Sequence, residues 1–143
     1  MNIVEQVVSL GVSKKLAEAG YPQEGVWWWA IQDGNNRDRD ELVFRKGGKL
    51  SAMGLWSTVE DFFVAPTVVE LGLVLPSKIT IGVIAGKSQI HYLYTAKSDI
   101  DFTCFYAMYN GQTRIHSEDS NTEADARAKL WLWLKENGYL EVK

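Results

Sequence analysis

Apolar and polar residues recur along this chain at two spacings, and each spacing predicts a type of secondary structure. Intervals of three and four residues, the spacing of a helix, occur in "LGVSKKLAEAG" from residue 10, "PTVVELGLVLP" from residue 66 and "NTEADARAKLWLWLKENGYL" from residue 121. Intervals of two, the spacing of a strand, fill much of the chain between them. In the last helix the only continuous polar stripe is Asp125, Lys129 and Glu136, so we expect most of its surface to be covered.

The expected helices carry residues that typically begin and end helices. Ser9 and Thr122 are favoured N-cap residues, and Thr67 with Glu70 three positions later forms a capping box. The first and last helices both finish with Gly-Tyr, in "KLAEAGY" and "WLKENGY". Glycine adopts the left-handed conformation at low cost, so shared C-cap chemistry explains this echo better than an internal repeat does.

The first predicted hairpin lies in "KITIGVIAGKSQIHYLYTA". A two-residue turn at Gly86 and Lys87 pairs Ile79 with Tyr94 across the hairpin. Because alternate residues of a strand point to opposite faces, this register puts six apolar side chains, among them Ile79 and Tyr94, on one face and His91 on the other, mixed face.

The second predicted hairpin lies in "IDFTCFYAMYNGQTRIHSE". Asn110 and Gly111 are the strongest short signal for a type I′ turn. This turn places Cys104 on the core face as a buried structural thiol, and it places Arg114 and His116 on the opposite face.

Three consecutive tryptophans in "GVWWWAIQ" lie on a predicted strand, which a polar loop connects to a second strand in "ELVFRKG". Trp27 and Trp29 share an apolar face with Ile31, and we expect them in the core. Trp28 shares the opposite face with Gln32. There it either packs beneath a helix or loop or offers a flat surface to a partner, since tryptophan is enriched at interface hot spots.

Together these elements predict a single α+β domain over residues 1–143. We expect an antiparallel meander sheet of about five or six strands, with the N- and C-terminal helices packed on one face and a short middle helix at an edge or end. Residues 47–64 carry no clear pattern of apolar and polar positions. Their glycines indicate loops around a possible short strand at residues 55–57.

Composition narrows the classes of partner. The formal net charge is -3, which provides no strong attraction to nucleic acid or anionic lipid, and no apolar run is long enough to span a membrane. The basic residues between 37 and 49 are mixed with acidic ones, as in a solvated loop. A single cysteine and the lack of a secretion signal predict a cytoplasmic location.

Three stretches, in order, carry a resemblance to known sequences: "VSLGVSKKLAEAGYPQEGVWWW", "APTVVELGLVLP" and "EADARAKLWLWLKENGYL". Together they resemble a group of small uncharacterised proteins encoded in phage and prophage genomes. The chain departs from this group at Leu73 and Val74, where an acidic or polar residue is usual. The resemblance implies a phage-related origin and a fold; the group has no assigned activity, catalytic residues or cofactor, so it implies no mechanism.

Polar and aromatic residues on the predicted non-core faces form a candidate binding surface: Trp28, Gln32, His91, Arg114 and His116. The two histidines could meet across neighbouring strands, although ordinary surface histidines show the same pattern. Two histidines without a His-Cys or His-Glu spacing do not make a metal site, so we expect no metal and no cofactor.

The last helix supplies a second candidate surface. Trp131 and Trp133 lie two positions apart and therefore about 160° around the helix. One is expected to pack on the sheet, and the other under a loop or against a second subunit in a homodimer.

The sequence favours a non-enzymatic phage or prophage accessory protein that binds a host or phage protein. The alternative is a small-molecule binding protein, in which Trp28 stacks on a nucleotide base or a metabolite and Arg114 lies near its phosphate. Neither nucleic acid nor a membrane is an expected partner.

Overall fold

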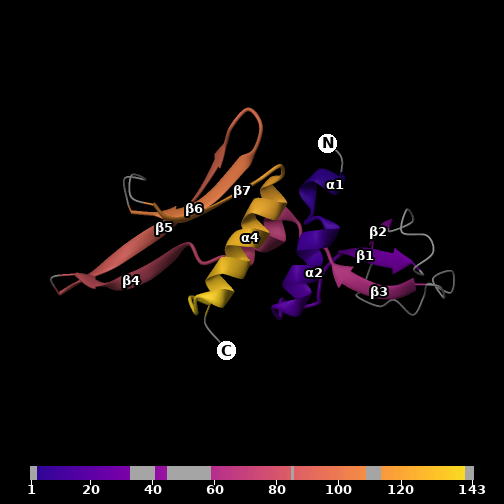
Figure 1. Cartoon of the computed structure of the whole chain (residues 1–143), viewed down its shortest axis with the longest axis horizontal. Helices are drawn as coiled ribbons and strands as arrows, with labels where there is room; N and C mark the ends of the chain where they lie inside the picture. Colours follow the sequence, from indigo (N-terminus) through magenta and orange to yellow (C-terminus); the bar gives the residue numbers. More distant parts are fainter. Residues whose placement is uncertain (1–2, 33–40, 45–58, 85, 109–113, 141–143) are drawn as a thin grey trace.

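The computed structural model describes residues 3–32, 41–44, 59–84, 86–108 and 114–140 (Figure 1). In these ranges the chain is an α+β protein, as the sequence predicts. Its helices are α1 (Ile3–Gln6), α2 (Leu10–Glu18), α3 (Val68–Val74) and α4 (Glu123–Glu136). Its strands are β1 (Trp27–Gln32), β2 (Glu41–Phe44), β3 (Val59–Val64), β4 (Lys78–Ile84), β5 (Lys87–Lys97), β6 (Phe102–Ala107) and β7 (Arg114–Ser120).

The described strands form two antiparallel sheets, whereas the sequence predicted one meander. One sheet has the order β2-β1-β3 and the other the order β4-β5-β6-β7. Figure 1 shows the helices between the two sheets: α4 packs on β6 and β7, and α2 packs on β3 and on α4. The predicted N- and C-terminal helices are thus confirmed as α2 and α4, and they lie between two sheets (Figure 1).

Thr67 and Thr122 cap their helices as predicted, whereas Ser9 occupies the N-cap position of α2 without a capping hydrogen bond from its side chain. In α3, Oγ1 of Thr67 accepts a hydrogen bond from the amide of Glu70, and the Glu70 carboxylate accepts one from the amide of Thr67, each at 3.1 Å. At the start of α4, Oγ1 of Thr122 accepts from the amide of Asp125 at 3.2 Å. Each bond satisfies an amide that has no partner within its helix.

The core is centred on α4. The fully buried residues of α4 form two groups, small alanines near its start and leucines near its end: Ala124, Ala126, Ala128, Leu130 and Leu134. The alanines allow close approach of neighbouring elements, and the expectation that most of this helix is covered is confirmed. Asp125 and Lys129 of the expected polar stripe are half-buried, and Glu136 is exposed.

The segment between α1 and α2 ties the helices to the first sheet. The amide of Val8 donates to the carbonyl of Pro66 at 3.0 Å, and the indole N–H of Trp29 donates to the carbonyl of Val8 at 2.8 Å. The amide of Ser9 donates to Oδ1 of Asp125 at 2.7 Å, which joins the start of α2 to the first turn of α4.

The three tryptophans divide between the two strand faces differently from the prediction. Trp28 and Ala30 belong to the buried core, with Trp28 only 6% exposed, whereas Trp27 and Trp29 are half-buried. Trp28 lies directly opposite Val64 of β3, which is also buried. The choice of Trp27 and Trp29 as the core pair was wrong, because the helices cover the other face of β1.

Strand β3 is an element that the sequence did not define. It pairs antiparallel with β1, which places β1 in the centre of its sheet, between β2 and β3. The strands predicted in "GVWWWAIQ" and "ELVFRKG" are confirmed as β1 and β2, and they pair antiparallel. The loop at residues 33–40, the short strand expected at residues 55–57 and the basic residues there lie outside the described residues.

The register of the β4–β5 hairpin differs from the expected one. Ile84 pairs with Lys87, and the turn between them contains Gly86 at φ 78. An irregularity between residues 80 and 83 shifts the pairing further, so Ile79 lies opposite His91 and not opposite Tyr94. A shift by an odd number of residues exchanges the faces, which moves His91 into the core.

The β6–β7 pairing begins as predicted and then shifts at a bulge. Ala107 lies opposite Arg114, as a turn at residues 110–111 requires, although that turn itself lies outside the described residues. Between Tyr106 and Ala107 the register slips by one residue, so Tyr106 faces His116. The bulge therefore turns His116 to the core side of the sheet, beneath α4.

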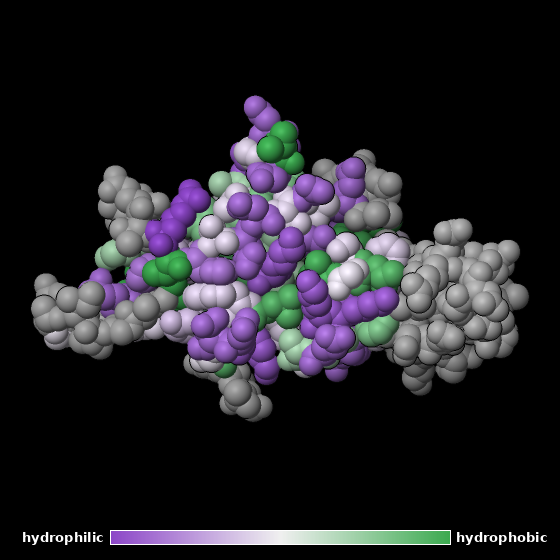
Figure 2. All heavy atoms as spheres, in the orientation of Figure 1, coloured by the Kyte–Doolittle hydropathy of each residue, from purple (hydrophilic) through white to green (hydrophobic). Residues whose placement is uncertain are grey.

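One face of the described part of the molecule is largely polar. Figure 2 shows hydrophilic residues and residues of intermediate hydropathy over most of the visible face, with hydrophobic residues in small areas. No helix in the described part of the chain is long and apolar enough to cross a membrane.

Candidate functional site

An open cleft of about 690 Å³ lies where α2, α3 and α4 end and β4 begins. We call it the helix-end cleft. Its lining is mainly apolar and aromatic, with two lysines: Tyr21, Pro22, Val74, Pro76, Lys78, Ile79, Thr80, Trp131, Lys135, Gly138, Tyr139 and Leu140.

Tyr21 and Tyr139 are each placed at this cleft by a helix C-terminal turn of the same type. At the end of α2, the amide of Gly20 donates to Ala17 and the amide of Tyr21 donates to Leu16. At the end of α4, Gly138 and Tyr139 donate in the same way to the carbonyls of residues 135 and 134. Both glycines have positive φ, and both arrangements are Schellman motifs. The repeated Gly-Tyr of the sequence is therefore confirmed as shared C-cap chemistry, and it brings two phenols to one site.

Two aromatic rings that line the cleft are in contact with each other. Tyr21 and Trp131 meet edge to face, with centroids 5.0 Å apart and planes at 74°, and both are buried. Burial, with a smaller contribution from the negative charge of Glu70, raises the pKa of Tyr21 to about 12. Its phenol therefore keeps its proton at neutral pH and remains a hydrogen-bond donor.

The wall of the cleft continues into a stack of rings between α4 and β7. Tyr139 stacks on Trp133 with centroids 5.3 Å apart, and Trp133 stacks on His116 at 4.3 Å. Nε2 of His116 lies 2.9 Å from Oε1 of Glu118, two positions along β7. This stack links the cleft to the edge of the four-stranded sheet.

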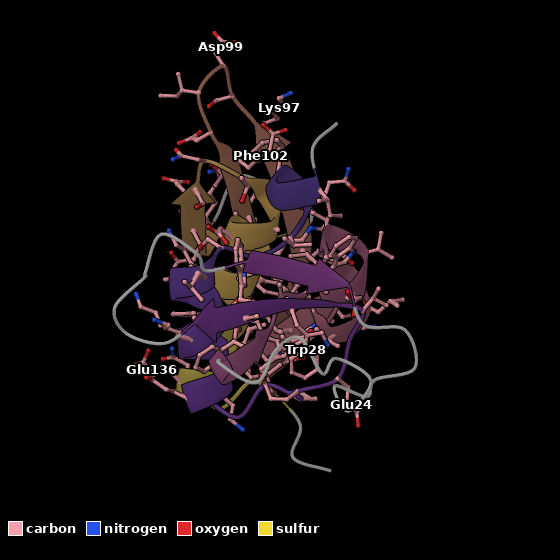
Figure 3. All side chains as sticks on the ribbon, turned by 90° about the vertical axis from the view of Figure 1, so that its right-hand side faces the viewer. Glu24, Trp28, Lys97, Asp99, Phe102 and Glu136 are labelled. Atoms are coloured by element: carbon pink, nitrogen blue, oxygen red, sulfur yellow. The ribbon has the colours of Figure 1, made fainter. Side chains whose placement is uncertain are left out.

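A second, smaller groove of about 280 Å³ adjoins the cleft and shares Tyr21, Pro22 and Val74 with it. Its other lining residues include two carboxylates, Glu24 and Glu70. We call it the acidic groove. Figure 3 shows Glu24 at the surface, on a part of the molecule remote from Asp99 at the tip of the β5–β6 hairpin.

Along the acidic groove, α3 presents large apolar side chains to solvent. Val69 is 72% exposed, Leu73 82% and Val74 42%. We call these three residues the α3 ridge. Val69 and Leu73 are four positions apart and so lie on one face of the helix.

The structure does not assemble the predicted binding surface. Trp28 lies in the core of the first sheet, and its indole N–H donates to the carbonyl of Gly25 at 3.0 Å. His91 is only 4% exposed on β5 of the other sheet. Both residues were wrong as surface candidates. Each lies on the face of its strand that is buried in the core. Gln32 ends β1, in the three-stranded sheet, and its side chain lies outside what the structure describes.

The remaining candidates of that surface lie on opposite faces of β7. The guanidinium of Arg114 sits 3.8 Å above the ring of Phe105, on the face away from α4. His116 faces α4 and stacks on Trp133. His91 and His116 therefore do not meet on a non-core face as predicted, since both point to the core side and β6 separates their strands.

The two tryptophans of α4 are both close to the cleft. Trp131 packs on Tyr21 and lines the helix-end cleft, and Trp133 lies against the sheet through His116. The prediction that they have different surroundings is confirmed. Sequence reasoning missed Lys78, Lys135 and the tyrosines as site residues, although the Gly-Tyr echo was a signal for the tyrosines.

The described residues offer binding surfaces and no assembled metal ligands. No group of three histidine, cysteine or acidic side chains in them could hold a metal ion. Cys104 is buried as predicted, and burial raises the pKa of its thiol. No protein-family model, curated protein or solved structure matches this chain.

Proposed function

We propose that this protein acts by binding another protein through the α3 ridge. The observation that carries the proposal is the exposure of three large apolar side chains on one short helix, with Leu73 at 82%. Contiguous exposed apolar residues on a soluble protein commonly mark an interaction site. The capping box at Thr67 fixes the start of α3, so the ridge is presented on an ordered element.

The acidic groove beside the ridge defines the chemistry of the partner. A partner side chain that packs on Leu73 would lie next to the carboxylates of Glu24 and Glu70. Opposite charges across an interface favour the correct partner and speed association. The proposed partner therefore presents an apolar side chain flanked by lysine or arginine.

We place this interaction in the cytoplasm of a bacterial host, with a host or phage protein as the partner and no enzymatic role. The sequence resemblance supports the phage-related origin. The low net charge and the single buried cysteine support the location.

The test compares two apolar residues of equal exposure. Leu73→Ser removes the centre of the ridge, and Ile100→Ser is the matched control, since Ile100 is 84% exposed in the β5–β6 hairpin. Each tagged variant and the natural sequence are used to retain proteins from lysate of phage-infected host cells. A retained protein is then purified, and its affinity for the three proteins is measured by calorimetry.

The expected result is one stoichiometric partner whose affinity falls at least tenfold with Leu73→Ser and is unchanged with Ile100→Ser, because burying a leucine contributes roughly 1.5–3 kcal/mol. The proposal fails if no protein is retained, or if the partner binds the Leu73→Ser protein equally well. Sedimentation velocity separates a further outcome: a dimer that Leu73→Ser dissociates would assign the ridge to a second copy of this chain.

A further inference from the structure

We propose that the helix-end cleft binds a small molecule in which a flat, apolar body carries one anionic group, a carboxylate or a phosphate. This site is separate in chemistry from the α3 ridge, so the inference goes beyond protein binding. Its lining comes from three separate segments of the chain, residues 21–22, 74–80 and 131–140, and its charged residues are Lys78 and Lys135.

The size and lining of the cleft suit a small molecule. Its volume of about 690 Å³ lies within the range of sites that enclose metabolites and similar ligands. Such sites are mostly apolar with a few polar groups that orient the ligand. Here the lining includes the rings of Tyr21, Trp131 and Tyr139 together with two prolines, which supply apolar surface for a flat ring.

The charged side chains that line the cleft are lysines, which favour an anionic ligand. Lys78 and Lys135 are both exposed, and none of the described residues that line the cleft is acidic. Helix C-termini carry partial negative charge, and three helices end here. In α2 and α4, however, carbonyl groups of the last turn already accept the Schellman hydrogen bonds. The full positive charges of the two lysines also outweigh the partial negative charges of the helix ends.

Tyr21 adds a neutral donor to these cations. Because its pKa is raised to about 12, its hydroxyl is protonated at any pH at which the protein would meet a ligand. A protonated phenol donates a hydrogen bond to an anionic oxygen, whereas an ionised one would repel it. The Glu70 carboxylate, whose charge also acts on Tyr21, lines the adjoining acidic groove and not the cleft. Two ammonium groups and one hydroxyl are a donor set suited to a single carboxylate or phosphate group.

The test uses two pairs of probes that differ only in charge. Indole-3-acetate is compared with neutral indole-3-ethanol, and adenosine 5′-monophosphate with neutral adenosine, by calorimetry with the full chain at low salt and ligand up to roughly 1 mM. The expected result is saturable binding of at least one anion and much weaker binding of its neutral partner. The anion that binds more tightly identifies the head group as carboxylate or phosphate.

Variants then locate the binding. Lys78→Gln and Lys135→Gln are each expected to weaken binding of the anion by roughly three- to tenfold, and the double variant by more. Lys15→Gln is the matched control, because Lys15 is an exposed lysine in the last turn of α2 outside the lining. Thr80→Trp, which fills the cleft from β4, is expected to abolish binding and leave the melting temperature within about 2 °C.

The proposal is overturned by any of three results. Neither anion binds; a neutral analogue binds as tightly as its anion; or the double lysine variant, folded like the natural protein, binds the anion unchanged. Leu73→Ser is expected to leave anion binding intact, so a failure of protein binding at the α3 ridge does not affect this test.

Discussion

The imidazole of His116 on β7 lies flat against the indole of Trp133 on α4, with 4.3 Å between the ring centroids and 7° between the planes. Oε1 of Glu118 lies 2.9 Å from Nε2 of the same imidazole. β7 is the last strand in the sheet order and has one neighbouring strand, β6. This stack therefore fastens the edge of the four-stranded sheet to the central helix.

The strength of this contact can be measured with a double-mutant cycle. His116→Ala and Trp133→Leu should show a coupling of about 0.5–1.5 kcal/mol in the free energy of unfolding, the range of stacked aromatic pairs. The measurement is urea denaturation of the four proteins of the cycle. The same cycle with His116→Ala and Ile100→Ser should give additive effects, and additivity in the His116–Trp133 cycle would contradict the stack.

Asp125 is expected to be important for stability because it joins two helices. Its Oδ1 accepts a hydrogen bond from the amide of Ser9 at 2.7 Å. Asp125 also lies in the first turn of α4, where a negative charge is favourable. Asp125→Ala should lower the free energy of unfolding by about 2 kcal/mol, and Asp125→Asn, which keeps an acceptor oxygen, by about 1 kcal/mol. Asp99→Ala, in the exposed β5–β6 loop, serves as the control and should change it by less than about 0.5 kcal/mol. Equal effects at the two positions would show that the bond to Ser9 does not stabilise the fold.

Stability should fall at alkaline pH because buried tyrosines keep their protons. The pKa of Tyr21 is raised to about 12 in the folded protein, mainly by burial, against roughly 10 in an unfolded chain. Its contribution to stability is thus complete below about pH 10 and is lost as the pH rises towards 12, with a slope of up to about 1.4 kcal/mol per pH unit. Burial also raises the pKa of Tyr106 and of Cys104, so they act in the same direction.

Tyr21→Phe isolates one of these groups, because phenylalanine keeps the ring contact with Trp131. Urea denaturation between pH 8 and 11 should show a shallower loss of stability in this variant than in the natural protein. An unchanged slope would mean that the phenol of Tyr21 is not protected from ionisation in the folded state. The pH values are set by the raised pKa of this residue.

Replacing His91 should be harmless or stabilising. Its Nδ1 is buried, and it neither accepts nor donates a hydrogen bond among the residues that the structure describes. Since an unpaired buried polar atom costs free energy, His91→Leu should leave the free energy of unfolding unchanged or raise it by up to about 1 kcal/mol. His116→Leu, which loses the contact with Glu118, should instead lower it. A loss of more than about 1 kcal/mol with His91→Leu would show that this imidazole has a partner.

Capping chemistry was the part of the fold that the sequence predicted best. Thr67 with Glu70, Thr122 and the two Gly-Tyr pairs act within a few residues of chain, so their patterns are complete in the sequence. The α+β class and the terminal helices follow from the same local signals. The division of the strands between two sheets depends on which distant strands pair, and β3 was not recognised at all.

Strand register was the main source of error for the site. The hydrophobic pattern around His91 fits two registers, and the observed one includes an irregularity between residues 80 and 83 that no local signal marks. At His116 a single bulge exchanges the faces after a correctly predicted pair. Each histidine was therefore placed on the wrong face, although its strand was predicted correctly.

The position of α4 between the two sheets also orders events during synthesis. The ribosome makes residues 123–136 after β6 and β7, the strands on which they pack, so the inner face of the four-stranded sheet stays uncovered until this helix is made. Until it emerges, Cys104 and Tyr106 on β6 have no cover on their core side. Nascent chains that expose paired strands and apolar faces are prone to aggregate and to engage chaperones. A ribosome stalled before residue 123 should therefore hold a chain whose four-stranded sheet is accessible to protease, and one stalled after α4 has cleared the exit tunnel should hold a chain in which that sheet is protected.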